Sequence, residues 1–200
     1  MAEESGRRER KRRQLVDHLA DTAWALFQDR GYDAVTMEAI ADAADVAKGT
    51  LYKHFAAKEA LLRHRFHRDL AEALPQLQAE LALLPTAAAR LRAFFQRSAA
   101  WSRQRRTYLG PYLRFHLQEA GTEGQTGGRS GLDHVLAGII TFGQQTGEFR
   151  RDIDPALAAY YLVFFHLGVL LRWLDQPQGD LTFEYRVMLD LFVQGLEHRP

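Results

Sequence analysis

The sequence predicts an all-α fold of about nine helices. Its apolar residues recur with a helical period along almost the whole chain, and no stretch alternates apolar and polar residues as a half-buried strand does. Of the 200 residues, 46% are hydrophobic and 26% are charged, which is ample for a folded protein of one or two domains. Several predicted helix ends also carry capping residues of their own.

Composition excludes several kinds of protein. Cysteine is absent, which excludes disulfides, thiolate metal sites and cysteine nucleophiles. No apolar segment follows the charged N-terminal residues MAEESGRRERKRR, so we expect no signal peptide. The longest apolar run, Leu157 to Leu171, has 15 residues, fewer than the roughly 18–20 that span a bilayer, and predicts a buried helix. We therefore expect a cytoplasmic protein without a membrane partner.

The first helix should carry one apolar stripe and end near Gly31. The stripe consists of Leu15, Leu19, Ala23, Leu26 and Phe27. Thr36 then has the position of an N-cap for a short second helix, and Glu38 in its first turn favours the positive end of the helix dipole. A tight turn at residues 44–47 leads to a third helix from about Lys48 to His54.

The rest of the chain predicts further helices. Lys58 begins a longer one, which Pro75 is expected to kink or interrupt. The remaining ranges are 87–105, 109–119, 132–146, 155–174 and 182–197. Asp154 followed by Pro155 is typical of an N-cap with proline at the first helical position, and Gly147 of a C-terminal cap.

Two short helices joined by a turn of three or four residues form a helix-turn-helix, whose second helix enters the DNA major groove. In the segment DVAKGTLYKHF, residues 45–55, the apolar side chains can face a core. The polar side chains left outside are Lys48, Thr50, Lys53 and His54. Lysine suits guanine O6 and N7, threonine can contact a base or a thymine methyl, and Gly49 lets the backbone approach DNA. The alternative is an ordinary basic helix in a helical bundle.

The segment TMEAIADAADVAKGTLYKHFAAKEALL, Thr36 to Leu62, resembles the DNA-binding signature of TetR-family transcriptional regulators. The shared marks are the starting threonine, the Ile-Ala pair, KGTLYKHF and the following K-E-x-L-L. The signature covers under a third of the chain, and the length and helical remainder also fit the family. The resemblance implies a DNA-binding domain over residues 1–56 and an effector-binding and dimerisation domain over 57–200.

The resemblance also implies roles for individual residues. Base edges would be contacted by Lys48, Gly49 and Thr50, and backbone phosphates by Thr36, Tyr52, His54 and Lys58. With Lys53 on the same outer face, these form the predicted contact surface for an operator in double-stranded DNA. Two positions depart from the family pattern: Asp45 stands where glycine is common, and Ala47 replaces a frequent serine. We expect weaker binding from them, or compensation by the basic N-terminus.

That N-terminus, Arg7 to Arg13, holds six basic side chains and one acid. It could reach into the minor groove as homeodomain arms do, or form a solvated start to the first helix. If the arm interpretation is wrong, deleting residues 1–13 should leave DNA affinity and its salt dependence unchanged.

The last two helices, 155–174 and 182–197, carry more apolar surface than one core can absorb, which favours a homodimer. In the family such helices form a four-helix bundle across the two-fold axis. The family also carries an apolar effector pocket in the second domain. The candidate lining residues are Phe95, Trp101, Tyr112, Phe115, His116, Phe142, Phe165 and His166, and for each of them core packing is the alternative.

The expected function is a ligand-responsive regulator. We expect a repressor that binds a palindromic operator as a homodimer and is released by a small hydrophobic or aromatic molecule, without a cofactor. An activator, or a helical binding or scaffold protein with an unused helix-turn-helix, remains open. An enzyme is not expected, since no known catalytic motif occurs. A metal site at His64 and His67 is disfavoured by the three arginines around them.

Overall fold

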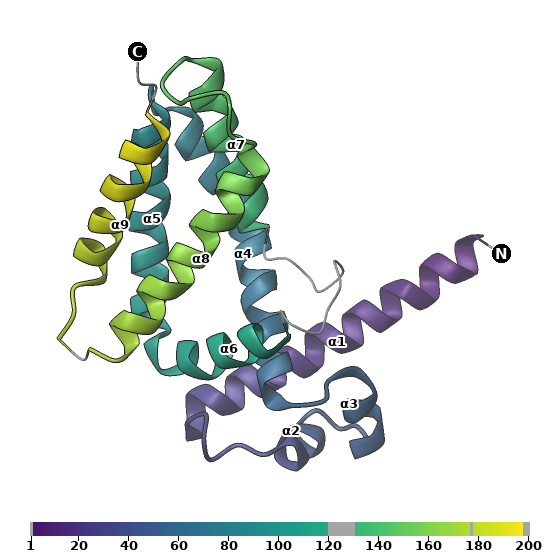
Figure 1. The fold of residues 1–200 in the computed structure, drawn as a ribbon. Helices are drawn as coiled ribbons and strands as arrows, with labels where there is room; N and C mark the ends of the chain where they lie inside the picture. Colours follow the sequence, from purple (N-terminus) through teal and green to yellow (C-terminus); the bar gives the residue numbers. More distant parts are fainter. Residues whose placement is uncertain (1, 120–130, 177, 198–200) are drawn as a thin grey trace. The chain divides into compact units, whose positions relative to one another are not determined.

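The chain is all-helical (Figure 1). The computed structural model describes residues 2–119, 131–176 and 178–197, and within them it has nine α-helices and no β-strand apart from an isolated bridge between Phe149 and Glu197. The helices are α1 (Ala2–Arg30), α2 (Met37–Ala43), α3 (Lys48–His54), α4 (Lys58–Ala82), α5 (Ala87–Gln104), α6 (Arg106–Glu119), α7 (Leu132–Gln145), α8 (Pro155–Leu174) and α9 (Leu181–Leu196). The predicted fold class is confirmed.

Most helix ends lie where the sequence places a capping residue. The side chain of Thr36 accepts a hydrogen bond from the backbone N–H of Ala39, and Asp154 caps α8 in the same way ahead of Pro155. Gly147 has a positive φ of 78° just beyond α7, a conformation that glycine adopts without strain. The largest shift is at α6, which begins at Arg106 rather than at residue 109.

Pro75 does not interrupt α4, so of the two outcomes expected from sequence, a kink or an interruption, the interruption is wrong. The helix continues from Lys58 to Ala82 with Pro75 inside it. Proline removes one backbone hydrogen bond, but Pro75 is exposed, so water can solvate the carbonyl that loses its partner. Phe66 and Leu81, on either side, are buried and hold both halves of the helix in place.

The chain divides into two compact units, Met1–Asp69 with Arg114–Glu123, and Leu70–Leu113 with Gly124–Pro200. Helices α4 and α6 each contribute residues to both. The core of the first unit lies where α1, α2, α3 and the start of α4 meet. Its fully buried side chains include Leu19, Phe27, Ile40, Leu51, Leu61 and Phe66. The predicted functional boundary at residue 56 stays a prediction.

In the second unit α7 packs on α8, α5 on α9, and α8 on α9. The close approach at Gly143 of α7 requires glycine, because a Cβ there would lie 2.3 Å from Cδ2 of Phe149. The carboxylate of Glu148 then accepts the backbone N–H groups of Ala87 and Ala88, at 2.5 and 2.8 Å, at the start of α5. A negative charge at this end of a helix stabilises it through the helix dipole.

Helix α8 is not buried within the protomer, which corrects the expectation for the apolar run. Ala158, Leu162 and Leu170 face the core, whereas Tyr161 and Phe165 are more than half exposed. Among the described residues, α8 is the one helix that could cross a membrane by length and composition. It packs on α7 and on α9.

Candidate DNA-binding interface and effector region

Helices α2 and α3 meet at a tight turn in the first unit. The backbone N–H groups of Ala44 and Val46 donate to the carbonyls of Ile40 and Ala41 at 2.9 and 3.0 Å, which closes the end of α2. Asp45 has a φ of 53°, and it is the one non-glycine residue with positive φ among those described. The aspartate thus adopts the left-handed conformation in which glycine is common.

Helix α3 separates a packing side from a solvent side. Leu51 is 0% and Phe55, just after the helix, 6% exposed, while Lys48, Gly49, Tyr52 and Lys53 are exposed. No atom lies within 4 Å of a Cβ built on Gly49, so the backbone of the first turn is open to solvent. Ala47 makes no side-chain cap to this helix, as its replacement of serine predicts. The helix therefore presents its polar N-terminal residues outward over an apolar base.

The predicted phosphate contacts flank this surface. Thr36 and Tyr52 are exposed, and His54 and Thr50 are half-buried. The hydroxyl of Thr36 accepts from Ala39 N at 3.2 Å, which leaves its own O–H available to a phosphate. Tyr52 Oη lies 3.5 Å from a carboxylate oxygen of Glu38, on the first turn of α2. Both hydroxyls lie at the ends of the short helices, where the motif meets the DNA backbone.

Lys58 has a structural role that the sequence did not reveal. Its ammonium donates to the carbonyls of Tyr32 and Val35, at 2.8 and 3.1 Å, and lies 4.3 Å from the ring centroid of Tyr32. It thereby holds the loop between α1 and α2 onto α4. The hydroxyl of Tyr32 donates to Glu59 at 2.6 Å, and burial together with this carboxylate raises the pKa of Tyr32. These two hydrogen bonds use two of the three N–H groups of the ammonium. A phosphate contact by Lys58 stays a prediction and would use the third N–H group.

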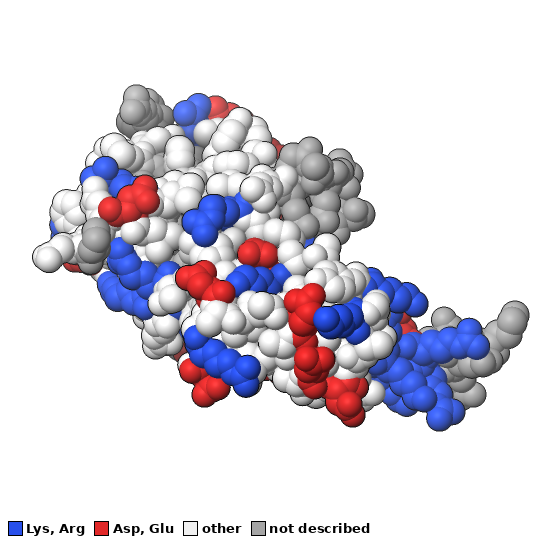
Figure 2. All heavy atoms as spheres, turned by 90° about the horizontal axis from the view of Figure 1, so that it is seen from below, with Lys and Arg blue, Asp and Glu red and all other residues white. Residues whose placement is uncertain are grey.

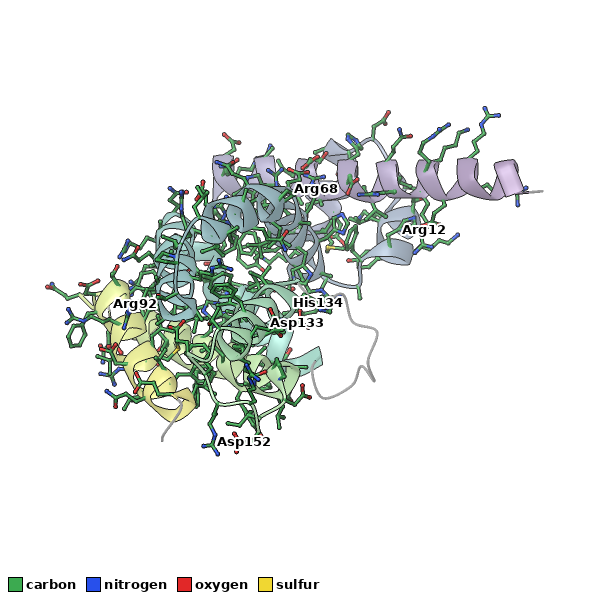
Figure 3. The ribbon with its side chains drawn as sticks, turned by 90° about the horizontal axis from the view of Figure 1, so that it is seen from above. Arg12, Arg68, Arg92, Asp133, His134 and Asp152 are labelled. Carbon is green, nitrogen blue, oxygen red and sulfur yellow. The ribbon has the colours of Figure 1, made fainter. Side chains whose placement is uncertain are left out.

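A network of charged side chains joins α1 to α4 within the first unit. Arg65 donates to Asp21 at 2.5 Å and to Asp69 at 2.8 Å. Arg68, which is labelled in Figure 3, also pairs with Asp21. Partial burial alone would raise the pKa of Asp21, but the guanidinium groups of Arg68 and Arg65 lower it. No local motif marks the pairs between the two helices, because Asp21 lies more than 40 positions from Arg65 and from Arg68 in the chain.

The two histidines on α4, His64 and His67, also lie beside charged side chains. His64 Nε2 lies 2.7 Å from Asp17, and burial, reinforced by Arg63, His116 and His64, lowers the pKa of His67 to about 4. The positive charge of Arg63 beside His67 disfavours a cation there. Within the described part of the chain, no group of three or more ligand-type side chains could hold a metal ion.

The second unit has a cavity of about 160 Å³ between α4, α5 and α7. Its lining residues are Gln78, Leu81, Ala82, Arg90, His134, Val135, Gly138 and Ile139. The guanidinium of Arg90 donates to the carbonyls of Leu84 and Ala82 and lies 3.5 Å from the ring centroid of Phe142. The cavity is thus mainly apolar, with a cation held at its wall.

The eight predicted effector residues are divided between the two units. Phe115 and His116 belong to the first unit, whereas the other six lie in the second. Phe142 contacts Arg90 of the cavity wall, and Phe165 is 52% exposed with its ring edge on Phe192. Phe95 and His166 do meet, with ring centroids 5.7 Å apart. Their role in effector binding stays a prediction.

Phe95 and His166 belong to a buried polar cluster that the sequence did not predict in full. Tyr185 Oη lies 2.8 Å from His166 Nδ1, and Ser102, which is 2% exposed, hydrogen-bonds to the same tyrosine. Burial lowers the pKa of His166 to about 4 and raises that of Tyr185. The imidazole is therefore neutral at pH 7, and its Nδ1 can accept the tyrosine proton.

Two short helices at a left-handed turn, with the polar N-terminus of the second exposed, define a helix-turn-helix DNA-binding protein. The family model for bacterial regulatory proteins of the tetR family matches residues 19–64. The HTH-type transcriptional repressor KstR2 of Rhodococcus jostii is 27% identical over 191 residues, covering 89% of each chain. The chain therefore carries a DNA-binding domain of the TetR family of bacterial transcriptional regulators.

Solved structures share the whole fold. Thermus thermophilus FadR, a TetR-family repressor in complex with lauroyl-CoA, superposes with a TM-score of 0.78 at 24% identity, covering 92% of this chain and 96% of that one. Bacillus subtilis FadR in complex with stearoyl-CoA gives a TM-score of 0.63 at 22% identity, over 90% and 98% of the two chains. At these identities the likeness establishes the fold alone.

Proposed function

We propose that the protein is a cytoplasmic homodimeric repressor that binds a palindromic operator and releases it when a small hydrophobic effector binds. The observation that carries this proposal is the division of α3, whose buried Leu51 anchors the helix while Lys48 and Gly49 are exposed. One such helix contacts only a few base pairs. Specific binding therefore needs two copies, with half-sites spaced about 34–36 Å apart or a multiple of it.

The surface of α8 and α9 supports the homodimer. Within one protomer the exposed large apolar side chains of these helices are Leu157, Tyr160, Tyr161, Phe164, Phe165, Leu171, Phe183, Val187 and Leu191. So many exposed apolar side chains are costly in water, and a second copy related by a two-fold axis would cover the same surface on both chains. Aromatic side chains dominate it, as they do at stable interfaces.

The cavity in the second unit supports a small apolar effector. Its lining of Leu81, Val135 and Ile139 favours a hydrocarbon group, and Arg90 and His134 at its wall suit an anionic or polar end. Lauroyl-CoA and stearoyl-CoA, bound by the two solved relatives, combine these features. Fatty acyl-CoA thioesters are therefore the first effector class to test. Repression is proposed because a bound dimer can occlude a promoter and because KstR2 and Thermus thermophilus FadR are repressors.

The test is a mobility shift on DNA that flanks the gene, or on DNA selected from a random pool, at about physiological salt. We expect wild type to shift this DNA and Lys48→Ala and Tyr52→Ala to lose the shift, since both side chains are exposed and neither supports the core. Acyl-CoA thioesters of increasing chain length are then added to the complex. A chain length that raises the melting temperature and also releases DNA supports the proposal.

Two results would contradict it. Failure of wild type to select any sequence would favour a scaffold protein. The second contradicting result is that acyl-CoA or other apolar ligands stabilise the protein but do not weaken its binding to DNA. The protein would then be a DNA-binding regulator that is not released by these ligands. A reporter gene placed behind the selected operator separates repression from activation by the sign of its response.

A further inference from the structure

The first turns of α1 extend beyond the core of the first unit. Residues 6–14 are all exposed, residues 15–17 are half-buried, and Leu19 and Ala20 are the first buried residues of the helix. The family model begins at residue 19, so the extension lies outside the part that identifies the family. We call residues 7–13 the basic extension. Its side chains project on several sides of the helix, with Arg12 among them (Figure 3).

The basic extension concentrates positive charge on exposed turns of α1. It holds six basic residues and one acid, Glu9, which pairs with Arg12 at 3.8 Å. Both partners of this pair are about two-thirds exposed, so the pair contributes little. Like charges recur at helical neighbours, Arg7 with Lys11 and Arg10 with Arg13, which destabilises the free helix. A polyanion would replace this repulsion by attraction.

The extension belongs to the same compact unit as α2 and α3. Seen from the side on which these helices lie, Lys and Arg gather over the N-terminal part of α1 (Figure 2). A helix with side chains is about 10–12 Å wide, whereas the minor groove is about 6 Å wide. The minor-groove arm considered from sequence is therefore excluded for a segment that remains helical. Phosphates on the outside of the duplex are accessible to it.

We propose that the basic extension lies along the phosphate backbone next to the bases contacted by α3 and lengthens the DNA contact of each subunit. The proposal rests on the DNA binding of the proposed function. From Leu19 to Arg7 the helix rises about 18 Å, which corresponds to about five base pairs of duplex. Because phosphates carry no sequence information, the extension supplies affinity and salt dependence but no sequence preference.

The test compares two triple variants of the full chain. Arg7→Gln, Arg10→Gln and Arg13→Gln together remove three charges from the extension and keep a good helix former at each position. Arg92→Gln, Arg97→Gln and Arg150→Gln remove three exposed charges from the second unit and serve as the matched control. Affinity for the selected operator is measured by fluorescence anisotropy between about 50 and 200 mM salt.

We expect the slope of log K against log salt to become shallower by up to about five in the extension variant, because each phosphate that its two subunits no longer neutralise accounts for about 0.9. The control should keep the wild-type slope. The preference for the operator over a mismatched one should remain in both. Adding about five base pairs to each end of a minimal operator should strengthen binding of wild type and of the control, but not of the extension variant.

Equal slopes for the two variants, or no gain from longer duplexes with wild type, would overturn the inference while the operator binding itself stands. An unchanged DNA slope combined with binding of wild type, but not of the extension variant, to phosphatidylserine vesicles would assign the extension to a membrane surface instead. If wild type binds no operator and Lys48→Ala behaves identically, the proposed function fails and the inference fails with it.

Discussion

The two units of this protein expose opposite kinds of side chain. The first presents lysines, hydroxyls and the open backbone of Gly49 over an apolar base formed by Leu51 and Phe55. The second presents an apolar surface on α8 and α9 and encloses hydrogen-bonded Ser102, Tyr185 and His166. The first surface suits a charged and hydrated partner such as DNA. The second suits another protein surface, because exposed aromatic rings gain free energy by burial.

The comparison shows that the functional residues of the first unit lie close together in the sequence, whereas those of the second unit lie far apart. The proposed contacts to bases come from residues within one short segment, so their types and spacing are visible as a motif. The polar cluster of the second unit brings together α5, α8 and α9, and its cavity brings together α4, α5 and α7. Variants that change one surface without changing the packing beneath it can break or sharpen this comparison.

The largest effect is expected from Tyr161→Glu on the apolar surface of α8. Tyr161 is 53% exposed in the protomer, so the change should cost little in protomer stability. In a two-fold interface it buries two unpaired carboxylates, which should dissociate the dimer and lower operator affinity by more than about 100-fold. Sedimentation velocity and anisotropy measure the two effects. Leu83→Glu, at an 85% exposed residue after α4, is the control and should remain dimeric.

A smaller effect on DNA binding, with the opposite sign for stability, is expected from Gly49→Ala. Alanine favours a helix over glycine by about 0.5–1 kcal/mol, and no atom of the protein obstructs its Cβ. Thermal unfolding should therefore show a slightly more stable protein, while the added methyl at the DNA-facing backbone should weaken operator binding about 10-fold. Gly138→Ala in α7 is equally open and should leave operator binding unchanged. A Gly49→Ala protein with full operator affinity would contradict the assigned contact.

The next effect is on the pH dependence of stability. Burial, with Arg63, His116 and His64, lowers the pKa of His67 to about 4, whereas an unfolded histidine has a pKa of about 6.5. Below pH 6.5 the unfolded chain binds a proton here that the folded chain does not, so stability present at pH 7 is lost as the pH falls toward 4. Between pH 7 and 5, the free energy of unfolding of His67→Phe should fall by about 1–2 kcal/mol less than that of wild type.

Urea unfolding at several pH values measures this difference. The exposed His134→Phe controls for the number of histidines. If wild type and both variants lose stability in parallel, His67 does not contribute to the pH dependence.

The smallest effect is expected from Asp45→Gly at the turn between α2 and α3. The φ of 53° at Asp45 is unfavourable for a side chain with a Cβ, and glycine should stabilise the protein by about 0.5 kcal/mol. Asp42→Gly, inside α2, should instead destabilise it by about 0.5–1 kcal/mol. Chemical denaturation distinguishes the two, and equal effects of the two glycines would show that the turn is not strained.

The sequence by itself determined the helical fold class, most helix bounds and the family. Helical periodicity and capping residues such as Thr36 and Asp154 act over one turn, and the helix-turn-helix signature lies within a single segment, so these features are local. Only the tertiary structure decided that α4 continues through Pro75, that Lys58 holds the loop after α1, and that α8 exposes one face. Each of these depends on partners distant in sequence, or on which residues reach water. The polar cluster around Tyr185 and the cavity beside Arg90 exist for the same reason, because long-range packing alone brings their side chains together.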